Sequence, residues 1–401
     1  MHEGAEMSQE VSTEPGDMTT TPLTVLQVLP SLVTGGVERG AVDIAAALVA
    51  EGERGIVVSS GGPMVHDLTR AGAEHITLPV ASKNPFVMYK NIDRLAEIIR
   101  ANNVNIVHAR SRAPAWSAYY AARKTGARFI TTFHGTYNLG LPFKKLYNSI
   151  MTRGDRVIAI SEFIARHILD TYHIDPSRIR VIHRGINFDV FDPATVSAER
   201  VIKLASDWRL PDGVPIIMLP GRLTQWKGQA VLIEALSLLG RYDVRCIIVG
   251  SEQGKTRYTR RLQSLIDKFD LSDIVHIVGE CRDMPAALML ADVVVHASTD
   301  PEAFGRVIVE AQAMGRPVVA SDHGASRELV EPGETGWLAP PGDAKSLSEA
   351  LQNALRLSAE DREILADKAR RRARAQFGDI AMCDNTLDTY RSLLADQRSL
   401  R

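Results

Sequence analysis

Residues 24–59 read TVLQVLPSLVTGGVERGAVDIAAALVAEGERGIVVS. Two apolar, β-branched runs in this stretch, Thr24–Leu29 and Gly55–Ser59, predict strands, and the amphipathic segment Val37–Ala50 between them predicts a helix. Strands that are apolar at nearly every position are typical of a parallel sheet with helices on both faces. The stretch therefore predicts a β–α–β unit, the building block of an α/β fold.

The same alternation continues along the chain. The first half contains further predicted strands at Val104–His108, Phe129–Phe133 and Arg156–Ile160 and helices at Pro85–Ala101, Ala113–Lys124 and Phe163–Thr171. A polar stretch over 184–213 interrupts the pattern. It then restarts with predicted strands at Pro215–Pro220, Val244–Gly250, Ile274–Val278, Val293–His296 and Pro317–Ser321. Helices at Ala344–Leu357, Asp361–Ala375 and Ile380–Ala395 end the chain.

The expected fold is therefore two doubly wound parallel sheets, each a Rossmann-like domain, that face a cleft. Ligands of open α/β sheets bind outside the carboxyl ends of the strands, so this cleft is the expected ligand site. We expect residues 1–21 to be a disordered acidic tail, 22–188 the first domain and 189–379 the second. Residues 380–401 are expected to form a C-terminal helix that returns to the N-terminal domain.

The charge of the chain is unevenly distributed. The 401 residues carry a formal net charge of −1, which argues against a strongly basic nucleic-acid-binding protein. This total is a cancellation: residues 1–21 carry −5, residues 22–188 carry +8 and residues 189–401 carry −4. The three cysteines have no CxxC spacing, which favours a reducing compartment. No apolar run reaches the length of a membrane span, so any membrane contact is expected to be peripheral.

A pair of glycines, Gly35 and Gly36, follows the first predicted strand and precedes the helix that begins at Val37. Glycines at such a turn let backbone amides approach a phosphate at the positive end of a helix. The spacing is not GxGxxG, so a dinucleotide site is only weakly indicated. A tight turn without a ligand explains the pair equally well.

Two cations follow a strand of the second half, in the segment GRLTQWKG (221–228). Arg222 and Lys227 lie at the strand's carboxyl end, just before a helix, where a guanidinium, an ammonium and a helix N-terminus together suit a diphosphate. Taken alone, the pair is also consistent with solvated loop cations. The segment GSEQGKT (250–256) is one residue short of a P-loop, which argues against an NTPase.

The most informative stretch is DPEAFGRVIVEAQAMGRPVVASDHGASRELV (300–330). Glu302 lies in the loop that opens a helix, and Glu310 lies eight residues on, on the helix face expected to pack inward. A buried carboxylate is costly unless it accepts hydrogen bonds, and ligand hydroxyls such as a ribose diol would donate them. Phe304 and Gly305 offer backbone amides at the helix start.

One histidine, His134, ends the strand Phe129–Phe133 and is followed by Gly135. A lone histidine is more often structural, but its position at a strand end favours a functional role. The sequence contains no D-x-D, no H-E-x-x-H, no Cys/His cluster with metal-ligand spacing and no G-x-S-x-G. No metal site is therefore expected.

Taken together, these motifs resemble those of a known family. Gly35-Gly36-Val37-Glu38, His134-Gly135, Arg222 with Lys227, and the E-x7-E pair Glu302/Glu310 are similar in order to the retaining glycosyltransferases of family four, which have the GT-B fold. The resemblance covers nearly the whole chain beyond the tail. The segment CRDMPAALMLADVVVHASTDPEAFGRVIVEAQAMGRPVVASDHGASREL is especially similar to bacterial members that build lipopolysaccharide cores and other surface glycans.

The resemblance implies roles in binding a nucleotide-sugar donor. Arg222 and Lys227 would bind the diphosphate and stabilise the leaving group, and the loop of Gly35 and Gly36 would close over the phosphates. Glu310 would bind the ribose hydroxyls. The residues around the transferred sugar and the base would be Glu302, the amides of Phe304 and Gly305, His134 near sugar and acceptor, and Arg282 and Met284 beside the base.

The implied activity is a retaining, metal-independent transfer of a mannose- or glucose-type hexose. The donor would be GDP- or UDP-linked, with no cofactor, and the acceptor a lipid-linked or lipopolysaccharide-core glycan in cell-envelope synthesis. A nucleotide-sugar epimerase on the same fold, a transferase with a small soluble acceptor and a catalytically silent binding protein are the alternatives. Asn187, in VIHRGIN, stands where an aspartate is common in the family.

The resemblance also implies that the N-terminal domain, residues 22–188, takes the acceptor. Its charge of +8 suits an anionic partner. Within it, LPFKKLYNSIMTRGDR (141–156) sets the apolar residues Phe143, Leu146, Tyr147 and Ile150 beside Lys144, Lys145 and Arg153. Such a pattern fits an anionic membrane surface or an ordinary domain-surface helix. The expected location is cytoplasmic, peripheral on the cytoplasmic face of the inner membrane, with no nucleic-acid partner.

Overall fold

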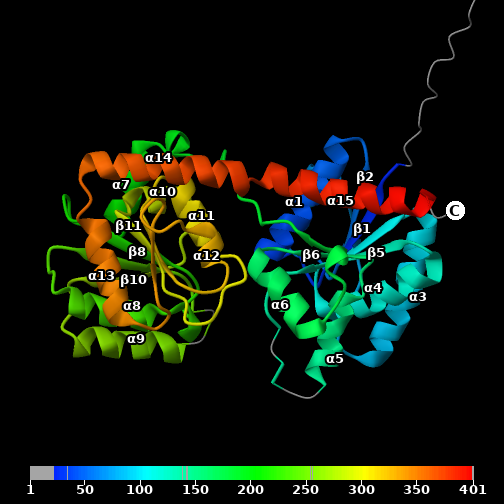
Figure 1. Ribbon diagram of the computed structural model, residues 1–401, viewed down its shortest axis with the longest axis horizontal. Coiled ribbons are helices and arrows are strands. Elements are labelled where there is room, and N and C mark those ends of the chain that lie inside the picture. Colours follow the sequence, from blue (N-terminus) through cyan, green and yellow to red (C-terminus); the bar gives the residue numbers. More distant parts are fainter. Residues whose placement is uncertain are drawn as a thin grey trace, which may run out of the picture.

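The computed structural model contains two α/β domains side by side (Figure 1). It describes residues 22–33, 35–137, 139–140, 143–252, 254 and 256–399, with the backbone alone for 397–399. The acidic tail expected over 1–21 lies outside the described residues. None of the described helices is long and apolar enough to cross a membrane.

The N-terminal domain is built on a parallel sheet whose faces are covered by helices (Figure 1). Its described strands are β1 (Thr24–Val28), β2 (Arg54–Ser59), β3 (Glu74–Thr77), β4 (Ile106–Ala109), β5 (Arg128–Phe133), β6 (Arg156–Ala159) and β7 (Ile179–Val181). Its described helices are α1 (Gly36–Ala50), α2 (Val65–Arg70), α3 (Pro85–Ala101), α4 (Arg112–Thr125), α5 (Lys144–Asn148) and α6 (Glu162–Tyr172), with 3-10 turns η1 (Ser149–Thr152) and η2 (Pro176–Arg178). The strand order β3-β2-β1-β4-β5-β6-β7 reverses between β1 and β4, where doubly wound sheets open a crevice.

The C-terminal domain repeats this architecture. Its described strands are β8 (Ile216–Pro220), β9 (Arg245–Val249), β10 (Val275–Gly279), β11 (Val293–His296), β12 (Val318–Ser321) and β13 (Trp337–Ala339), in the parallel order β10-β9-β8-β11-β12-β13. Its described helices are α7 (Ala198–Asp207), α8 (Gln229–Leu239), α9 (Thr256–Lys268), α10 (Met284–Leu290), α11 (Arg306–Ala313), α12 (Ser326–Leu329), α13 (Ala344–Leu355) and α14 (Ala359–Gln376), with 3-10 turns η3 (Pro193–Thr195) and η4 (Gln225–Lys227).

These two parallel sheets confirm the predicted fold class. Three strands were not predicted from the sequence: β3, β7 and β13. They are three or four residues long and lie at sheet edges. Edge strands are covered on fewer sides, so β3 and β7 have no fully buried residue and lack the continuous apolar run of an inner strand.

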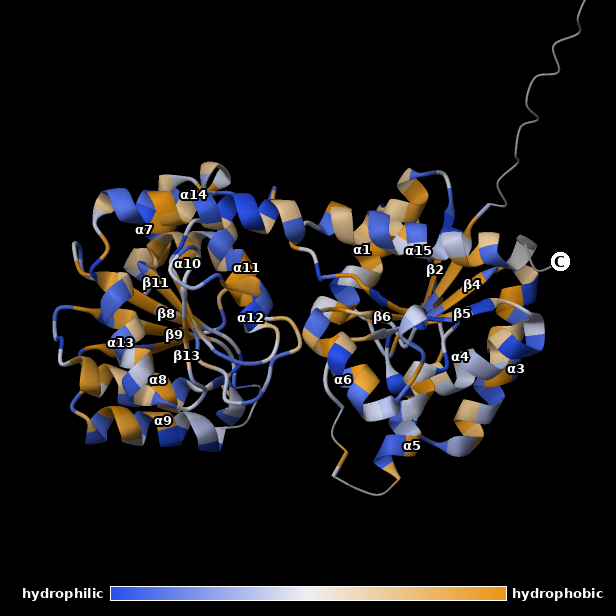
Figure 2. Ribbon diagram, in the orientation of Figure 1, coloured by the Kyte–Doolittle hydropathy of each residue, from blue (hydrophilic) through white to orange (hydrophobic). Residues whose placement is uncertain are grey.

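The strands form the core of each domain, which Figure 2 shows as a hydrophobic centre. All five residues of β1 are buried, and they alternate between the two faces of the sheet. Leu26 packs into the cluster on one face, and Val25 packs with Leu48 on the other. Each such buried aliphatic side chain contributes about 1.5–3 kcal/mol, so the sheets are rigid supports for the loops at their ends.

The last helix, α15 (Asp379–Ser399), lies on the N-terminal domain, where it packs against α1 (Figure 1). Its Tyr390 is fully buried, and the hydroxyl lies 2.6 Å from Nδ1 of His108 on β4. The chain crosses between the domains twice, near Ile186 and near Phe377, and the two crossing segments lie side by side. The amide of Ile186 donates to the Phe377 carbonyl (2.9 Å), and the amide of Asp379 donates to the Ile186 carbonyl (3.1 Å). The domain limits drawn from the sequence, 22–188, 189–379 and 380–401, stay a prediction.

Candidate functional site

A cleft of about 440 Å³ lies where the two domains meet. The N-terminal domain contributes loops that follow β5, β6 and β7, and the C-terminal domain contributes η4 and the loop between β11 and α11. This places the cleft at the carboxyl ends of the strands, as the fold predicts. The residues that line it are His134, Gly135, Thr136, Ile160, Arg184, Trp226, Asp300, Pro301, Glu302, Ala303, Phe304, Gly305 and Arg306.

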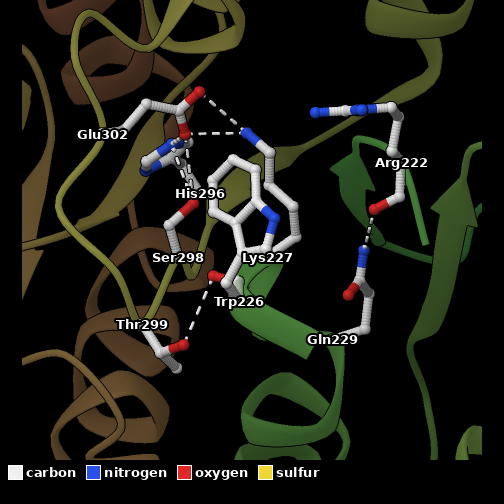
Figure 3. Close-up of polar contacts among 8 residues, drawn as sticks. All are labelled: Arg222, Trp226, Lys227, Gln229, His296, Ser298, Thr299 and Glu302. Carbon is white, nitrogen blue, oxygen red and sulfur yellow. Dashed lines mark hydrogen bonds and ion pairs between the residues drawn. The ribbon is translucent and has the colours of Figure 1, made fainter. Parts of the chain in front are cut away.

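The polar centre of this cleft is the carboxylate of Glu302 (Figure 3). The Nζ of Lys227, at the end of η4, lies 2.8 Å from Oε1 and 2.7 Å from Oε2. On the other side, Nε2 of His296, the last residue of β11, lies 2.5 Å from Oε2. The hydroxyl of Ser298 donates to the same oxygen at 3.1 Å. Glu302 is thus held in one orientation by residues from two loops.

These contacts keep Glu302 ionised. Burial by itself raises the pKa of this carboxyl, but the hydrogen bond and charge of His296 and the charge of Lys227 outweigh it, so the pKa lies well below its usual range. A carboxylate that accepts several hydrogen bonds and faces an ammonium is stabilised in its charged form. The site therefore presents a fixed acceptor for hydroxyl groups at neutral pH.

A glycine makes the approach of Lys227 to Glu302 possible. Gly228 has φ 72°, in the left-handed region, and a Cβ there would lie 1.8 Å from the carbonyl oxygen of Ala297. Only glycine allows η4 to pack this closely on the loop after β11. The amide of Thr299 donates to the Trp226 carbonyl (2.7 Å), and Nζ of Lys227 lies 4.5 Å from the centre of the Trp226 ring.

The second predicted cation, Arg222, lies at the end of β8 and is exposed. Its carbonyl accepts a hydrogen bond from Nε2 of the buried Gln229 (3.0 Å), which fixes its backbone. In Figure 3 its guanidinium points to the same side of the site as the Lys227 ammonium. Neither cation is a lining residue of the cleft itself. Lys227 borders the cleft through its contact with the lining residue Glu302.

The second glutamate, Glu310, lies on α11, as predicted, with its side chain 12% exposed. Burial raises its pKa, and Arg306 one turn earlier acts in the opposite direction through an ion pair of 3.1 Å. Gly305, with φ 91°, directly precedes α11, and the buried Phe304 packs edge-on against Phe377. The amides of Phe304 and Gly305 therefore open a helix beside the cleft.

The histidine predicted from its strand-end position, His134, lines the cleft from the N-terminal domain. Neither of its ring nitrogens has a hydrogen-bond partner among the described residues. Burial and the nearby positive charge of Arg184 lower its pKa well below the usual range, so the ring is neutral. His134 therefore lines the cleft with a neutral ring whose two nitrogens are buried.

Besides Arg222, Lys227 and Glu310, four more predicted residues lie outside the lining of this cleft: Gly35, Gly36, Arg282 and Met284. Gly36 begins α1 and lines a smaller cavity behind the cleft, next to Gly35. Arg282 and Met284 lie at the carboxyl end of β10, beside Asp283, which caps α10 and pairs with Arg200. The roles assigned to all of the candidate residues stay predictions.

Sequence reasoning missed His296, Ser298, Trp226 and Arg184. A polar residue at the end of the predicted strand Val293–His296 was a signal for His296 of the same kind that singled out His134. Trp226 stands beside Lys227 in GRLTQWKG, but its position on the cleft depends on the turn of η4. Nothing local marks Arg184, because its neighbours come from α1 and α11.

No cluster of three or more metal-ligating side chains occurs in the part of the chain that the structure describes.

Comparison with known proteins gives matches over both domains. The family model "Glycosyltransferase Family 4" matches residues 34–190, and "Glycosyl transferases group 1" matches residues 202–372. A crystal structure of a glycosyltransferase from Rickettsia africae is 41% identical, with a TM-score of 0.87, over 93% of this chain and 99% of that one. HepE of Anabaena in complex with UDP-glucose shares the fold at 23% identity, with a TM-score of 0.80, over 92% of this chain and 100% of that one.

A curated relative, D-inositol 3-phosphate glycosyltransferase of Mycolicibacterium smegmatis, is 29% identical over 253 residues. The match covers 62% of this chain and 56% of that protein, so the chain spans little more than half the length of this relative. The two family models leave only short stretches of the two domains unmatched, and the Rickettsia structure matches nearly end to end. The chain therefore belongs to glycosyltransferase family 4 and has the GT-B fold.

Proposed function

We propose that the protein is a retaining, metal-independent hexosyltransferase that moves a mannose- or glucose-type sugar from a GDP- or UDP-linked donor to a lipid-linked or lipopolysaccharide-core acceptor. The observation that carries this proposal is the ionised Glu302, fixed between Lys227 and His296 inside the cleft. A fixed carboxylate beside the backbone amides at a helix start is suited to hold sugar hydroxyls in one orientation. The Anabaena relative with a bound UDP-sugar supports a nucleotide sugar as the donor.

The transfer step follows from these groups. The bond between the anomeric carbon and the β-phosphate oxygen breaks, and the electron pair stays on the departing nucleoside diphosphate. The acceptor hydroxyl forms the new bond on the same face of the sugar, and its proton passes to the departing phosphate. Lys227, which borders the cleft, and Arg222, whose guanidinium points to the same side, offset the negative charge that develops; a metal ion performs this task in other enzymes.

A direct transfer on one face fits the site better than a covalent intermediate. Both oxygens of Glu302 are engaged by Lys227, and one of them also by His296 and Ser298. An ionised carboxylate whose charge is compensated by these contacts is a poor nucleophile, but it is well suited to orient a sugar. We therefore assign Glu302 to binding and orientation of the sugar.

The acceptor is assigned to the N-terminal domain, on the cytoplasmic face of the inner membrane. The exposed apolar side chains of the N-terminal domain include Phe86 and Tyr89 on α3 and Phe143 and Leu146 at α5. Ser117 on α4 donates to the Met88 carbonyl (2.8 Å), and Trp116 beside it donates to the Tyr147 carbonyl (3.2 Å). Both contacts involve the same turn of α4, which places the start of α3 close to α5.

The predicted apolar stripe at α5 is only half available for a membrane. Phe143 is 80% and Leu146 is 61% exposed, whereas Ile150 is buried in the core and Tyr147 stacks on Trp116. The cations Lys83, Lys90, Lys145 and Arg153, which are near the exposed apolar residues of α3 and α5 in sequence, are exposed as well. Bases next to exposed aromatic residues are typical of a surface that binds an anionic leaflet.

A panel of UDP- and GDP-linked hexoses, assayed by nucleotide release with the wild type and Glu302→Ala, tests the proposal. We expect one donor to be consumed by the wild type and not by the variant, while Glu234→Ala, an exposed glutamate on α8, keeps wild-type activity. Conversion of the donor to an epimeric nucleotide sugar without an acceptor would support the epimerase alternative instead.

A small soluble acceptor is the second candidate. It is favoured by the name of the mycobacterial relative, which specifies an inositol phosphate. Transfer to a soluble sugar phosphate in the absence of any lipid would support the soluble-acceptor candidate.

A further inference from the structure

The charges of the cleft are unevenly balanced between the two domains. On the C-terminal side the ammonium of Lys227 is already paired with Glu302. On the N-terminal side Arg184, which follows β7, reaches into the cleft and also lines the smaller cavity behind it. Among the described residues its guanidinium makes no ion pair or hydrogen bond with another side chain. Arg184 is therefore a cation without a fixed counter-charge.

This guanidinium lies against the first residue of α1. A Cβ placed on Gly36 would come within 2.6 Å of both terminal nitrogens of Arg184, so the two groups are in close contact. The first amides of a helix have no acceptor within the helix, and the helix dipole makes this end positive. A cation at the positive end of a helix is unfavourable by itself, because two positive groups face one another.

Further arginines add to the positive charge. Arg306 lines both cavities, and Arg110, which is 4% exposed, lines the inner one with its Nε lacking a partner among the described residues. Burial, followed by the charges of Arg306 and Arg110, lowers the pKa of Arg184 to about 9. The carboxylates of Glu38 and Asp43 offset only part of this charge.

We propose that Arg184, together with the first amides of α1, binds the distal phosphate of the donor's diphosphate from the N-terminal side of the cleft. This inference rests on the proposed function and adds Arg184 to the diphosphate ligands expected from the sequence, which are Arg222, Lys227 and the loop of Gly35 and Gly36. A planar guanidinium is suited to bind two oxygens of one phosphate at once, and an oxyanion in this place relieves the repulsion between Arg184 and the helix end. Because Arg184 and Lys227 come from different domains, the diphosphate would draw the two walls of the cleft together.

The test is the affinity of the whole protein for UDP and GDP, compared with UMP and GMP, by calorimetry. We expect Arg184→Gln to weaken binding of the preferred nucleoside diphosphate about tenfold or more, and binding of the matching monophosphate less than twofold. Arg184→Lys, which keeps the charge without the planar fork, should lie between. Arg180→Gln, an exposed arginine on the same β7 segment, is the matched control and should bind as the wild type does.

A second variant checks the contact with α1. Gly36→Ala should displace the guanidinium and weaken diphosphate binding in the same direction. The double variant should bind no more than twofold worse than Arg184→Gln, because both changes remove the same contact. Additive losses would contradict the proposal.

Several other outcomes would contradict the proposal. Unchanged diphosphate affinity in a folded Arg184→Gln protein overturns the inference. If inorganic phosphate then binds to the nucleotide-saturated wild type but not to the variant, the site takes an anionic group of the acceptor instead. An equal loss for mono- and diphosphates indicates a merely structural role. If the wild type binds neither UDP nor GDP, the proposed function itself fails, and this inference fails with it.

Discussion

The carboxylate of Glu328, on α12 of the C-terminal domain, caps the first turn of α6 in the N-terminal domain. The amides of Phe163 and Glu162 donate to its two oxygens at 2.5 and 2.8 Å, and Nε2 of His183 lies 3.3 Å away. A helix cap is normally supplied by a residue next to the helix in sequence. In α6, Ser161 supplies this local cap by accepting from the Ile164 amide (3.1 Å). Glu328 adds a second cap from across the domain interface, and opening of the cleft must break it.

Glu328→Gln should therefore loosen the domain interface. Burial alone raises the pKa of Glu328, but the hydrogen bonds from His183 and the two amides outweigh it and lower the pKa below the usual value. A depressed carboxyl pKa contributes stability that is present above the unfolded pKa and is lost as pH falls through the folded value. We expect a loss of about 1–2 kcal/mol at pH 7, measured by urea unfolding, that shrinks progressively as pH falls below the unfolded pKa of about 4.3.

The control for this variant is Glu334→Gln, which removes an exposed ion pair with Lys368. Exposed pairs contribute little, so its effect should stay below about 0.5 kcal/mol. Equal effects of the two variants at pH 7 would argue against a cap across the interface.

Lys227→Ala should remove one of the three cations assigned to the diphosphate, and it leaves Glu302 with the contacts to His296 and Ser298. Loss of one charge-stabilising donor costs about 2–4 kcal/mol of transition-state binding, which is about 30- to 900-fold in kcat/KM. Steady-state kinetics with the donor identified by the panel measures this. Lys203→Ala, an exposed lysine on α7, serves as the control, and an unchanged kcat/KM for Lys227→Ala would remove this residue from the mechanism.

Asp43 should make the folded state less stable as pH rises. Burial is the main cause that raises its pKa to about 6, only partly offset by Arg39. A raised carboxyl pKa gives stability that is present below the unfolded value and is lost as pH rises through the folded one. Asp43→Asn should therefore stabilise the protein at pH 8 by about 2 kcal/mol, and less at pH 5.

Thermal unfolding of Asp43→Asn across pH 5–8 measures this difference, with Asp212→Asn as the exposed control. A stability difference that does not change with pH would show that the ionised carboxylate has a partner strong enough to offset its burial.

Tyr390→Phe should destabilise the protein by about 1–3 kcal/mol, because it leaves Nδ1 of the fully buried His108 without its 2.6 Å partner. The other ring nitrogen keeps its contact with Thr132 at 2.7 Å. Chemical unfolding gives the magnitude, and Tyr242→Phe, at a 75% exposed tyrosine, should change nothing. A loss this large would also show that α15 contributes to the stability of the N-terminal domain.

The exposed apolar residues at α5 should anchor the protein to anionic vesicles. We expect the wild type to float with vesicles that contain phosphatidylglycerol at low salt, and less so with neutral vesicles. Replacing Phe143 and Leu146 with serine should abolish flotation, whereas Ile202→Ser, an equally exposed apolar residue on α7, should not. Failure of the wild type to bind anionic vesicles even at low salt would rule out this surface as a membrane-binding site.

Much of the fold follows from local patterns. The helix at Pro85–Ala101 and the strand at Val293–His296 match the structure to the residue, because their apolar periodicity is uninterrupted and, for the helix, Asn84 and Pro85 mark its start. The short edge strands β3 and β7 escaped prediction because their residues are only partly covered and do not differ from loop sequence.

By itself, the sequence determined the two α/β domains, the strand ends where a ligand site would lie and the residue types available there. Only the tertiary structure decided which of those residues meet. Lys227 and Glu302 are 75 residues apart, Phe163 and Glu328 are 165 apart, and Arg184 reaches Gly36 from the far end of the first sheet. Periodicity and turn signals report the local backbone, whereas these contacts depend on the strand order and on how the two domains meet.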